Sequence, residues 1–275
     1  MRIALHQSRT GTDPATNAIA LLTAVEDARA GGADMLFTPE MSGLLDQNRG
    51  RAAVHLREET DDPTLATVRA AAKQHRLWVS IGSLALKGGA DDRLVNRGFV
   101  IDDQGEIRAR YDKIHLFDVD LPTGESWRES AAYAPGERPV VVTTPWAKLG
   151  LSICYDIRFP DLYRALSDAG AELLSVPAAF TVPTGKAHWH ILLRARAIEA
   201  GAFVVAAAQA GKHEDGRSTF GHSLVVDPWG EILLDMEDGI GVGFADLDMA
   251  RLADVRARVP ALRHRRPIGA PETIS

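Results

Sequence analysis

Leu149-Gly-Leu-Ser-Ile-Cys154-Tyr-Asp-Ile-Arg158 joins a short apolar strand to a polar turn, and a helix is predicted to follow from about Asp161 to Ala169. A strand that turns sharply into a helix presents its first turn residue upward, as in a nucleophile elbow. In open α/β sheets, sites gather outside the carboxyl ends of the strands. The junction therefore predicts an α/β fold whose site lies around Cys154.

On both sides of this junction, short strands alternate with helices. Strands are predicted at residues 2–6, 35–38, 77–86, 95–101, 107–111, 140–143, 149–153, 172–176, 203–207, 223–227 and 231–234. Helices are predicted at residues 14–30, 63–75, 161–169, 186–200 and from 248 towards 258. Turn signals at Asp102–Gly105 and Pro228–Gly230 predict hairpins, so the sheets are expected to be mixed.

Two mixed sheets stacked face to face, with helices outside, would bury every apolar strand. We therefore expect a four-layer αββα sandwich. No segment of the chain resembles an interdomain linker. The expected organisation is a single domain over residues 1–267 and a C-terminal tail over residues 268–275.

The composition excludes several classes of protein. The 275 residues carry 31 Lys and Arg against 37 Asp and Glu, a net charge of −6, which gives no support to nucleic-acid binding. Cys154 is the only cysteine, which excludes a disulfide scaffold and thiolate-rich metal sites and favours a reducing compartment. Apolar runs fall short of the roughly 20 residues that cross a bilayer. We expect a cytoplasmic protein without a membrane partner.

The chemistry of Cys154 has two interpretations. A lone cysteine is most often an inert core residue, but its place at a strand end before Tyr155-Asp-Ile-Arg158 favours a nucleophile. A thiol needs a base or a positive neighbour to react at neutral pH. His188 and His190 are two apart in a predicted helix, point in different directions and make a poor metal pair. The remaining histidines show no Cys–His signature.

A carboxylate can replace histidine as the base. Glu40 follows Pro39 and the apolar run Met35-Leu-Phe37, so we expect partial desolvation to raise its pKa towards neutrality. Lys113 would hold a developing oxyanion and lower the pKa of the thiol. Taken singly, Glu40 is better explained as a solvated or helix-capping carboxylate, and Lys113 as one end of a surface ion pair with Asp112. Only the three residues together favour catalysis.

Three segments together resemble the signatures of the nitrilase (carbon–nitrogen hydrolase) superfamily: Phe37-Thr-Pro-Glu40, Tyr111-Asp-Lys-Ile-His-Leu-Phe117 and Gly150-Leu-Ser-Ile-Cys-Tyr-Asp-Ile-Arg-Phe-Pro160. The resemblance runs from Arg2 to about Pro267 and implies an αββα sandwich, a Glu–Lys–Cys triad and assembly as a dimer or larger. Flanking motifs, such as Gly221-His-Ser-Leu-Val-Val-Asp-Pro-Trp-Gly230, are similar to the Nit branch of small-acid amidases. Within that branch they most resemble the deaminated glutathione amidases.

The resemblance also implies a role for each site residue. Glu40 is then the general base, Lys113 the oxyanion stabiliser and Cys154 the nucleophile, with Glu129 as a second acid that orients Lys113. The implied substrate-binding residues are Tyr155, Arg158, Phe180 and Thr184. An equally good interpretation makes Arg158 an anchor for Asp156.

The segment between Lys113 and Glu129, with Asp118, Asp120 and Gly124, resembles a lid. The resemblance implies neither a metal nor an organic cofactor.

The predicted function is a cysteine-dependent amidase. It would hydrolyse a linear amide of a small carboxylic or 2-oxo acid to the acid and ammonia through a thioester. The expected partners are a small-molecule amide substrate and, in a homodimer, a second copy of the chain. An omega-amidase acting on 2-oxoglutaramate or 2-oxosuccinamate is the first alternative. A carboxylic-acid-binding scaffold without catalysis, an acyltransferase and, least favoured, a metal hydrolase are the others.

Overall fold

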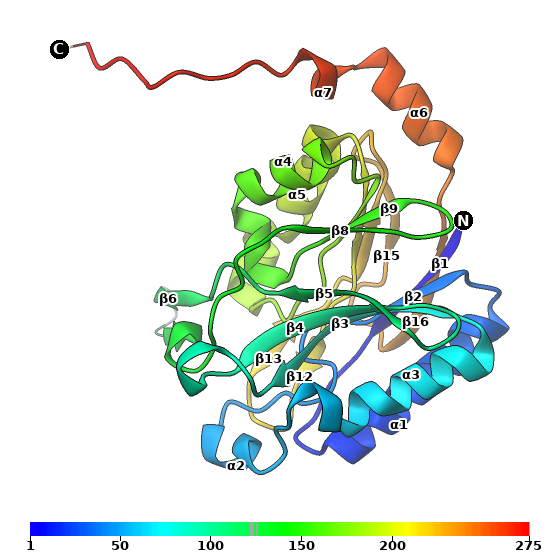
Figure 1. Ribbon diagram of the computed structural model, residues 1–275, viewed down its shortest axis with the longest axis vertical. Coiled ribbons are helices and arrows are strands. Elements are labelled where there is room, and N and C mark those ends of the chain that lie inside the picture. The colour runs from blue at the N-terminus through cyan, green and yellow to red at the C-terminus, as the bar shows by residue number, and fades with distance from the viewer. Residues whose placement is uncertain (121–123, 125, 275) are drawn as a thin grey trace.

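Two mixed sheets packed face to face form the centre of the computed structural model, which describes residues 1–120, 124 and 126–274 (Figure 1). The first sheet has the order β16 (Gly241–Asp246), β1 (Arg2–Gln7), β2 (Met35–Phe37), β3 (Trp78–Leu86), β4 (Val95–Ile101) and β5 (Ile107–Asp112). The second has the order β15 (Ile232–Asp235), β14 (Leu224–Val226), β11 (Phe203–Ala206), β10 (Leu173–Ser175), β9 (Lys148–Leu151) and β8 (Val140–Thr143). Two small hairpins pair β6 (Asp118–Asp120) with β7 (Ser126–Arg128) and β12 (Ala210–Lys212) with β13 (Ser218–Phe220).

The two sheets repeat one plan. In each, three central strands are parallel (β1, β2 and β3 in the first, β9, β10 and β11 in the second), and the flanking strands are antiparallel. Helices connect the parallel strands. They are α1 (Pro14–Ala30), the short α2 (Arg49–Ala53) and α3 (Pro63–His75) in the first half, and α4 (Pro160–Asp168) and α5 (Val182–Ala200) in the second.

Helices cover the outer faces of both sheets. Figure 1 shows α1 and α3 together on one side and α4 and α5 on the other, with the chain after α6 (Met249–Arg258) and α7 (Ala261–His264) extending away from the body. One apolar cluster contains residues of both sheets, such as Phe37 and Leu151, and a second packs α1 and α3 on the first sheet. The predicted αββα sandwich is confirmed.

Local sequence signals account for the helix starts. The Asp13 carboxylate accepts hydrogen bonds from the N–H groups of Ala15 and Thr16, and Asp62 caps α3 in the same way before Pro63. Such caps satisfy backbone donors that have no partner inside the helix. α1 and α3 therefore match their predicted ranges.

α5 begins at Val182, four residues before the predicted start at Lys186. Pro183 lies in its first turn, where a helix needs no N–H donor, so proline does not delay the start. Gly185 packs directly on Phe220: a Cβ at this position would lie 2.2 Å from the ring of that residue. The earlier start places Thr184 on the first turn of the helix.

β9 and β16 also differ from the sequence prediction. β9 ends at Leu151 rather than Ile153, because the chain turns into a 3₁₀ segment that begins at Cys154. β16 was not predicted, since Gly241-Val-Gly243 lacks the composition typical of a strand. It forms because all six of its residues pair antiparallel with β1.

The carboxyl ends of the strands in both sheets face a common region. Ser8, after β1, forms a parallel bridge with Gln209, after β11. Glu40, Lys113 and Cys154 follow β2, β5 and β9, so the fold brings them to the same place. Among the described residues, no helix is both long and apolar enough to cross a membrane.

Candidate active site

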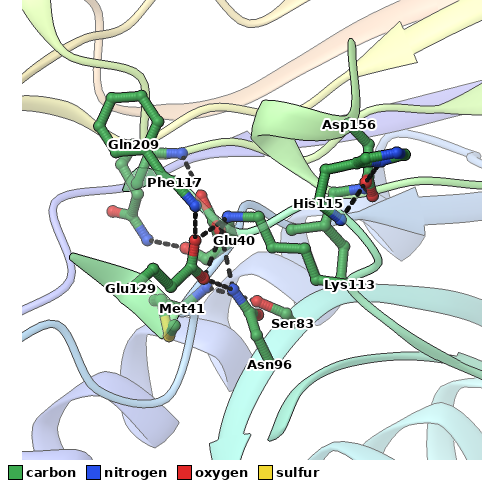
Figure 2. Close-up of polar contacts among 12 residues, drawn as sticks. Glu40, Met41, Ser83, Asn96, Lys113, His115, Phe117, Glu129, Asp156 and Gln209 are labelled. Carbon is green, nitrogen blue, oxygen red and sulfur yellow. Dashed lines mark hydrogen bonds and ion pairs between the residues drawn. The ribbon is translucent and has the colours of Figure 1, made fainter. Parts of the chain in front are cut away.

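Three residues far apart in the sequence meet at this end of the sandwich. Lys113 Nζ lies 2.8 Å from Glu40 Oε1 (Figure 2). The Cys154 side chain neighbours both Glu40 and Lys113. Their exposed fractions are 2% for Lys113, 4% for Glu40 and 7% for Cys154. All three line one cavity of about 480 Å³, so the buried sulfur still faces an opening. Glu40 is therefore not a solvated carboxylate, and Lys113 does not form a surface ion pair with Asp112.

The backbone at Cys154 is strained. Its φ of +49° is left-handed, a conformation that costs a residue with a side chain about 1–3 kcal/mol. The N–H of Cys154 donates to the carbonyl of Pro177 at 2.8 Å. Asp156 accepts hydrogen bonds from the Ile153 N–H at 2.9 Å and from the Tyr111 hydroxyl at 2.7 Å. These contacts hold the turn in the form that presents the sulfur at the end of β9.

Glu129 joins the cluster as a second carboxylate. The Lys113 ammonium lies 2.8 Å from Glu40 Oε1, 2.9 Å from Glu129 Oε2 and 3.1 Å from Glu129 Oε1. Glu129 Oε2 also accepts from the Phe117 N–H at 2.7 Å. An ammonium has three N–H donors, and here each has a carboxylate oxygen in reach. Glu129 thus holds Lys113 in place against Glu40.

The Glu40 carboxylate is fixed from several sides. Its Oε1 accepts from Asn96 Nδ2 at 2.9 Å, its Oε2 from the Ala179 N–H at 2.9 Å, and its backbone carbonyl from Gln209 Nε2 at 2.9 Å (Figure 2). Asn96 Nδ2 also donates to Glu129 Oε1 at 3.1 Å, so one amide bridges both carboxylates. The Asn96 oxygen is buried and has no hydrogen-bond partner among the described residues.

Sequence reasoning missed Asn96 and Gln209. Asn96 is the second residue of β4, in Val95-Asn-Arg-Gly98, and a polar side chain near the start of a strand was its only signal. Gln209 follows the apolar run of β11. A single polar side chain in a strand does not show which way it faces or what it contacts, so neither residue could be chosen from the sequence.

The electrostatics differ from the expectation at Glu40 and agree with it only in part at Cys154. Burial raises the pKa of Glu40, but the adjacent Lys113 ammonium outweighs it and lowers that pKa below its ordinary value of 4.5. The expected rise towards neutrality is therefore wrong. Burial and the charge of Glu40 raise the pKa of the Cys154 thiol well above 9.0, and Lys113 offsets this only in part. The charge of Lys113 lowers the thiol pKa as expected, but burial and Glu40 together have the larger effect.

Lys113 keeps its charge for a related reason. Burial by itself lowers the pKa of Lys113, whereas Glu129 and Glu40 together raise it well above 10.5. The resting cluster accordingly contains an ammonium, a carboxylate at Glu40 and a neutral thiol. This is the protonation state in which Glu40 can take a proton from Cys154.

Three of the predicted substrate-binding residues, Tyr155, Phe180 and Thr184, line the cavity. Arg158 is not among the described lining residues: its guanidinium lies over the rings of Tyr155, at 5.9 Å, and Phe180, at 5.4 Å. Arg158 therefore supports the cavity wall from behind. The structure does not show Arg158 as an anchor for Asp156. The Asp156 carboxylate contacts Tyr111, His115 and the Ile153 N–H instead.

The predicted lid contains the β6–β7 hairpin. Trp127 and Arg128 of β7 line the cavity, and Arg128 forms two 2.9 Å contacts with the carboxylate of Asp120 in β6. Asp118 accepts from the N–H of Ser130 at 3.0 Å. Residues 121–123 and 125 of the predicted lid lie outside the described residues.

Comparison with known proteins identifies the family. The family model for carbon–nitrogen hydrolases matches residues 2–257. The chain belongs to the carbon–nitrogen hydrolase family. A deaminated glutathione amidase from Yersinia enterocolitica is 42% identical over 237 residues, which cover 86% of this chain and 82% of the relative. A human deaminated glutathione amidase is 39% identical over 249 residues, 88% of this chain and 75% of the relative.

Solved structures of the superfamily have the same fold. The NitFhit protein of C. elegans superposes with a TM-score of 0.89 at 38% identity, over 96% of this chain and 65% of that one. An amidase from Nesterenkonia sp. AN1 has a TM-score of 0.78 at 30% identity, over 94% of this chain and 98% of that one, and was captured with acrylamide added to its active-site cysteine. The chain is a hydrolase of carbon–nitrogen bonds other than peptide bonds, and an amidase.

Proposed function

We propose that Cys154, Glu40 and Lys113 are the nucleophile, general base and oxyanion stabiliser of this amidase. The observation that carries the proposal is their convergence, with Glu129, on one cavity of about 480 Å³. Cys154 is the only thiol in the chain, and the ionised Glu40 beside it is the base that it needs.

In the acylation step, the Cys154 sulfur attacks the amide carbon while its proton passes to Glu40. The resulting oxyanion accepts from the Tyr155 backbone N–H and from Lys113. Protonation of Glu40 weakens its interaction with the Lys113 ammonium. The Lys113 N–H that pointed to Glu40 can then donate to the oxyanion. Glu40 then gives its proton to the leaving nitrogen, the carbon–nitrogen bond breaks, and a thioester remains on Cys154.

In the deacylation step, water attacks the thioester carbon and its proton passes to Glu40. The second oxyanion meets the same donors. Its collapse breaks the carbon–sulfur bond, and the proton returns from Glu40 to the thiolate of Cys154. The acid leaves, and the resting protonation state is restored. Glu129 and Asn96 hold Lys113 and Glu40 throughout, without bonding to the substrate.

The substrate that we propose is deaminated glutathione, in line with the names of the similar amidases. Besides Lys113, the described residues that line the cavity include four cationic side chains: Arg49, Lys87, Arg128 and Arg217. Cations of this kind bind carboxylates, and the substrate carries one at each end. With this substrate the leaving group is the amine of cysteinylglycine, whereas the sequence-based prediction named ammonia. The omega-amidase substrate 2-oxoglutaramate releases ammonia and remains the alternative.

One assay separates these substrates. Hydrolysis of either yields 2-oxoglutarate, so the appearance of this common product gives kcat/KM for both under matched conditions. We expect deaminated glutathione to have the larger kcat/KM, with no product from Cys154→Ala. A larger value for 2-oxoglutaramate would support the omega-amidase instead.

Mass spectrometry tests the thioester directly. We expect an acyl adduct on Cys154 when the enzyme is quenched during turnover, and none on Cys154→Ala. A scaffold that only binds acids forms no adduct. Product analysis with an added amine, such as hydroxylamine, distinguishes hydrolysis from acyl transfer, because a transferase would yield mainly the hydroxamate.

We further propose that the chain forms a homodimer in a reducing compartment, the cytoplasm. Exposed apolar side chains support the dimer: Ile198 at the end of α5 is 53% exposed and Trp229 is 51% exposed. With Val259 they line a groove of about 620 Å³. We expect Ile198→Asp to shift the mass measured by light scattering from dimer to monomer.

A further inference from the structure

A second cluster of polar side chains lies outside the catalytic cavity. It consists of His190 on α5, His222 just before β14 and Asp235 at the end of β15. One ligand atom from each lies within 4.8 Å of the other two. Asp235 Oδ2 is 2.9 Å from His190 Nε2, and Asp235 Oδ1 is 2.9 Å from His222 Nδ1.

The backbone around the cluster holds these side chains in position. The carbonyl of His222 accepts from the indole N–H of Trp189 at 2.8 Å, and its N–H donates to the carbonyl of Glu237 at 2.8 Å. The Glu237 N–H donates to Asp235 Oδ1 at 2.9 Å, and Phe220 stacks on the His222 ring at 4.4 Å. These contacts fix the His222 backbone and ring and the Asp235 carboxylate.

The donor set is that of a borderline transition metal. Two imidazole nitrogens and one carboxylate oxygen match the three protein ligands of many zinc sites. In a tetrahedral Zn²⁺ site with bonds of about 2.0–2.1 Å, ligand atoms lie roughly 3.3 Å apart. The nitrogen–oxygen separations of 2.9–3.2 Å are within a few tenths of an ångström of that value. The two imidazole nitrogens lie within 4.8 Å of each other, and we expect side-chain rotation to bring them to the ion.

Charge and access favour an ion over a simple hydrogen-bonded cluster. Within the described part of the chain, no lysine or arginine forms an ion pair with Asp235, whose close partners are the two histidines. The side chains of His190, His222 and Asp235 are 31%, 23% and 27% exposed, so an ion can reach them and a water can complete the coordination. His188, two residues from His190, contacts Arg158 instead and takes no part.

We propose that His190, His222 and Asp235 bind one divalent transition metal ion, with Zn²⁺ as the preferred ion. The site joins α5 to the β14–β15 hairpin and is separate from the catalytic residues. From the sequence alone, only His188 and His190 stood out as a possible metal pair, and their spacing of two residues in a helix makes that pair a poor one. The fold supplies His222 and Asp235 in place of His188.

Metal binding to the full-length chain tests the site. Because cysteine thiolates are zinc ligands in general, the measurements use Cys154→Ala, freed of metal with a chelator and desalted. Titration with Co²⁺ is followed by its visible absorption, and titration with Zn²⁺ by calorimetry. We expect one ion per chain, d–d bands of a four- or five-coordinate Co²⁺ ion, and a thermal midpoint that rises by about 5 °C at saturating Zn²⁺.

Two variants and a matched control locate the ion. Adding His190→Ala or Asp235→Asn to Cys154→Ala should weaken binding by at least about 100-fold, because the loss of an outer partner alone costs 10–100-fold. His188→Ala, on the same helix, should bind like the parent. The proposal is overturned if the parent binds no ion, or if His190→Ala and Asp235→Asn both bind as tightly as the His188→Ala control.

Discussion

The active site and the β6–β7 hairpin beside it contain ion pairs of almost the same length. Lys113 lies 2.8 Å from Glu40, and Arg128 lies 2.9 Å from Asp120. The side chains of the first pair are 2% and 6% exposed, and those of the second are 50% and 71% exposed. Water screens the charges of the exposed pair. The buried charges are instead stabilised by one another and by the hydrogen bonds from Asn96. Burial, rather than the distance between the charged atoms, therefore determines how strongly each ion pair affects the protein.

The largest expected effect is on catalysis at the buried pair. Glu40→Gln keeps the shape of the side chain and removes the base, so we expect kcat/KM to fall by at least about 1,000-fold. Steady-state assays with the preferred amide measure the loss. Glu106→Gln, an exposed carboxylate paired with Arg69, serves as the control and should retain full activity. A loss of less than tenfold in Glu40→Gln would exclude Glu40 as the base.

Loss of the buried cation should have the largest effect on stability. Lys113→Met leaves Glu40 and Glu129 buried without their counterion, so we expect the free energy of unfolding to fall by about 3–5 kcal/mol. Urea denaturation measures it. The double variant Lys113→Met/Glu40→Gln should recover part of the loss, since it removes one of the stranded charges. Equal stabilities for the two variants would contradict this account.

Asn96→Ala tests the amide that bridges the two carboxylates. Hydrogen bonds to charged groups contribute about 1.5–3 kcal/mol, so we expect kcat to fall about 10- to 100-fold while KM stays nearly constant. Asn96 acts by positioning Glu40, and a defect of packing alone would lower the thermal midpoint without this split. An unchanged kcat, or an effect confined to KM, would remove Asn96 from the catalytic arrangement.

The exposed pair should matter far less. Arg128→Ala removes the contact with Asp120 in β6, and we expect the free energy of unfolding to change by less than about 1 kcal/mol. The same urea experiment as for Lys113→Met gives the comparison. If Arg128→Ala destabilised the chain as much as Lys113→Met, burial would not be the distinguishing factor.

The smallest effect is expected in the pH profile. Because Lys113 lowers the pKa of Glu40 below 4.5, the base remains ionised on the acid side of neutrality, and it loses its charge only as the pH falls through that lowered value. We expect kcat to change less than about twofold between pH 5.5 and 8. A Glu40 pKa raised towards neutrality would instead make kcat fall steeply below pH 7. Measuring kcat across this range decides between the two.

Much of the fold could be predicted because its signals are local. The caps Asp13 and Asp62 and the apolar strands placed α1, α3 and most of the sheets correctly. The predictions fail for segments whose structure depends on a partner far away in the sequence. β16 depends on pairing with β1, and the first turn of α5 depends on Phe220 packing against Gly185.

The sequence by itself determined the α/β class, the family and the three residues Glu40, Lys113 and Cys154, because turn residues, periodicity and motifs are properties of short segments. Only the tertiary structure decided the direction of the pKa shifts at Glu40 and Cys154, the bridging place of Asn96 and the meeting of His190 with His222 and Asp235. Electrostatic interactions depend on distance and burial in space. Neither quantity exists until the chain has folded.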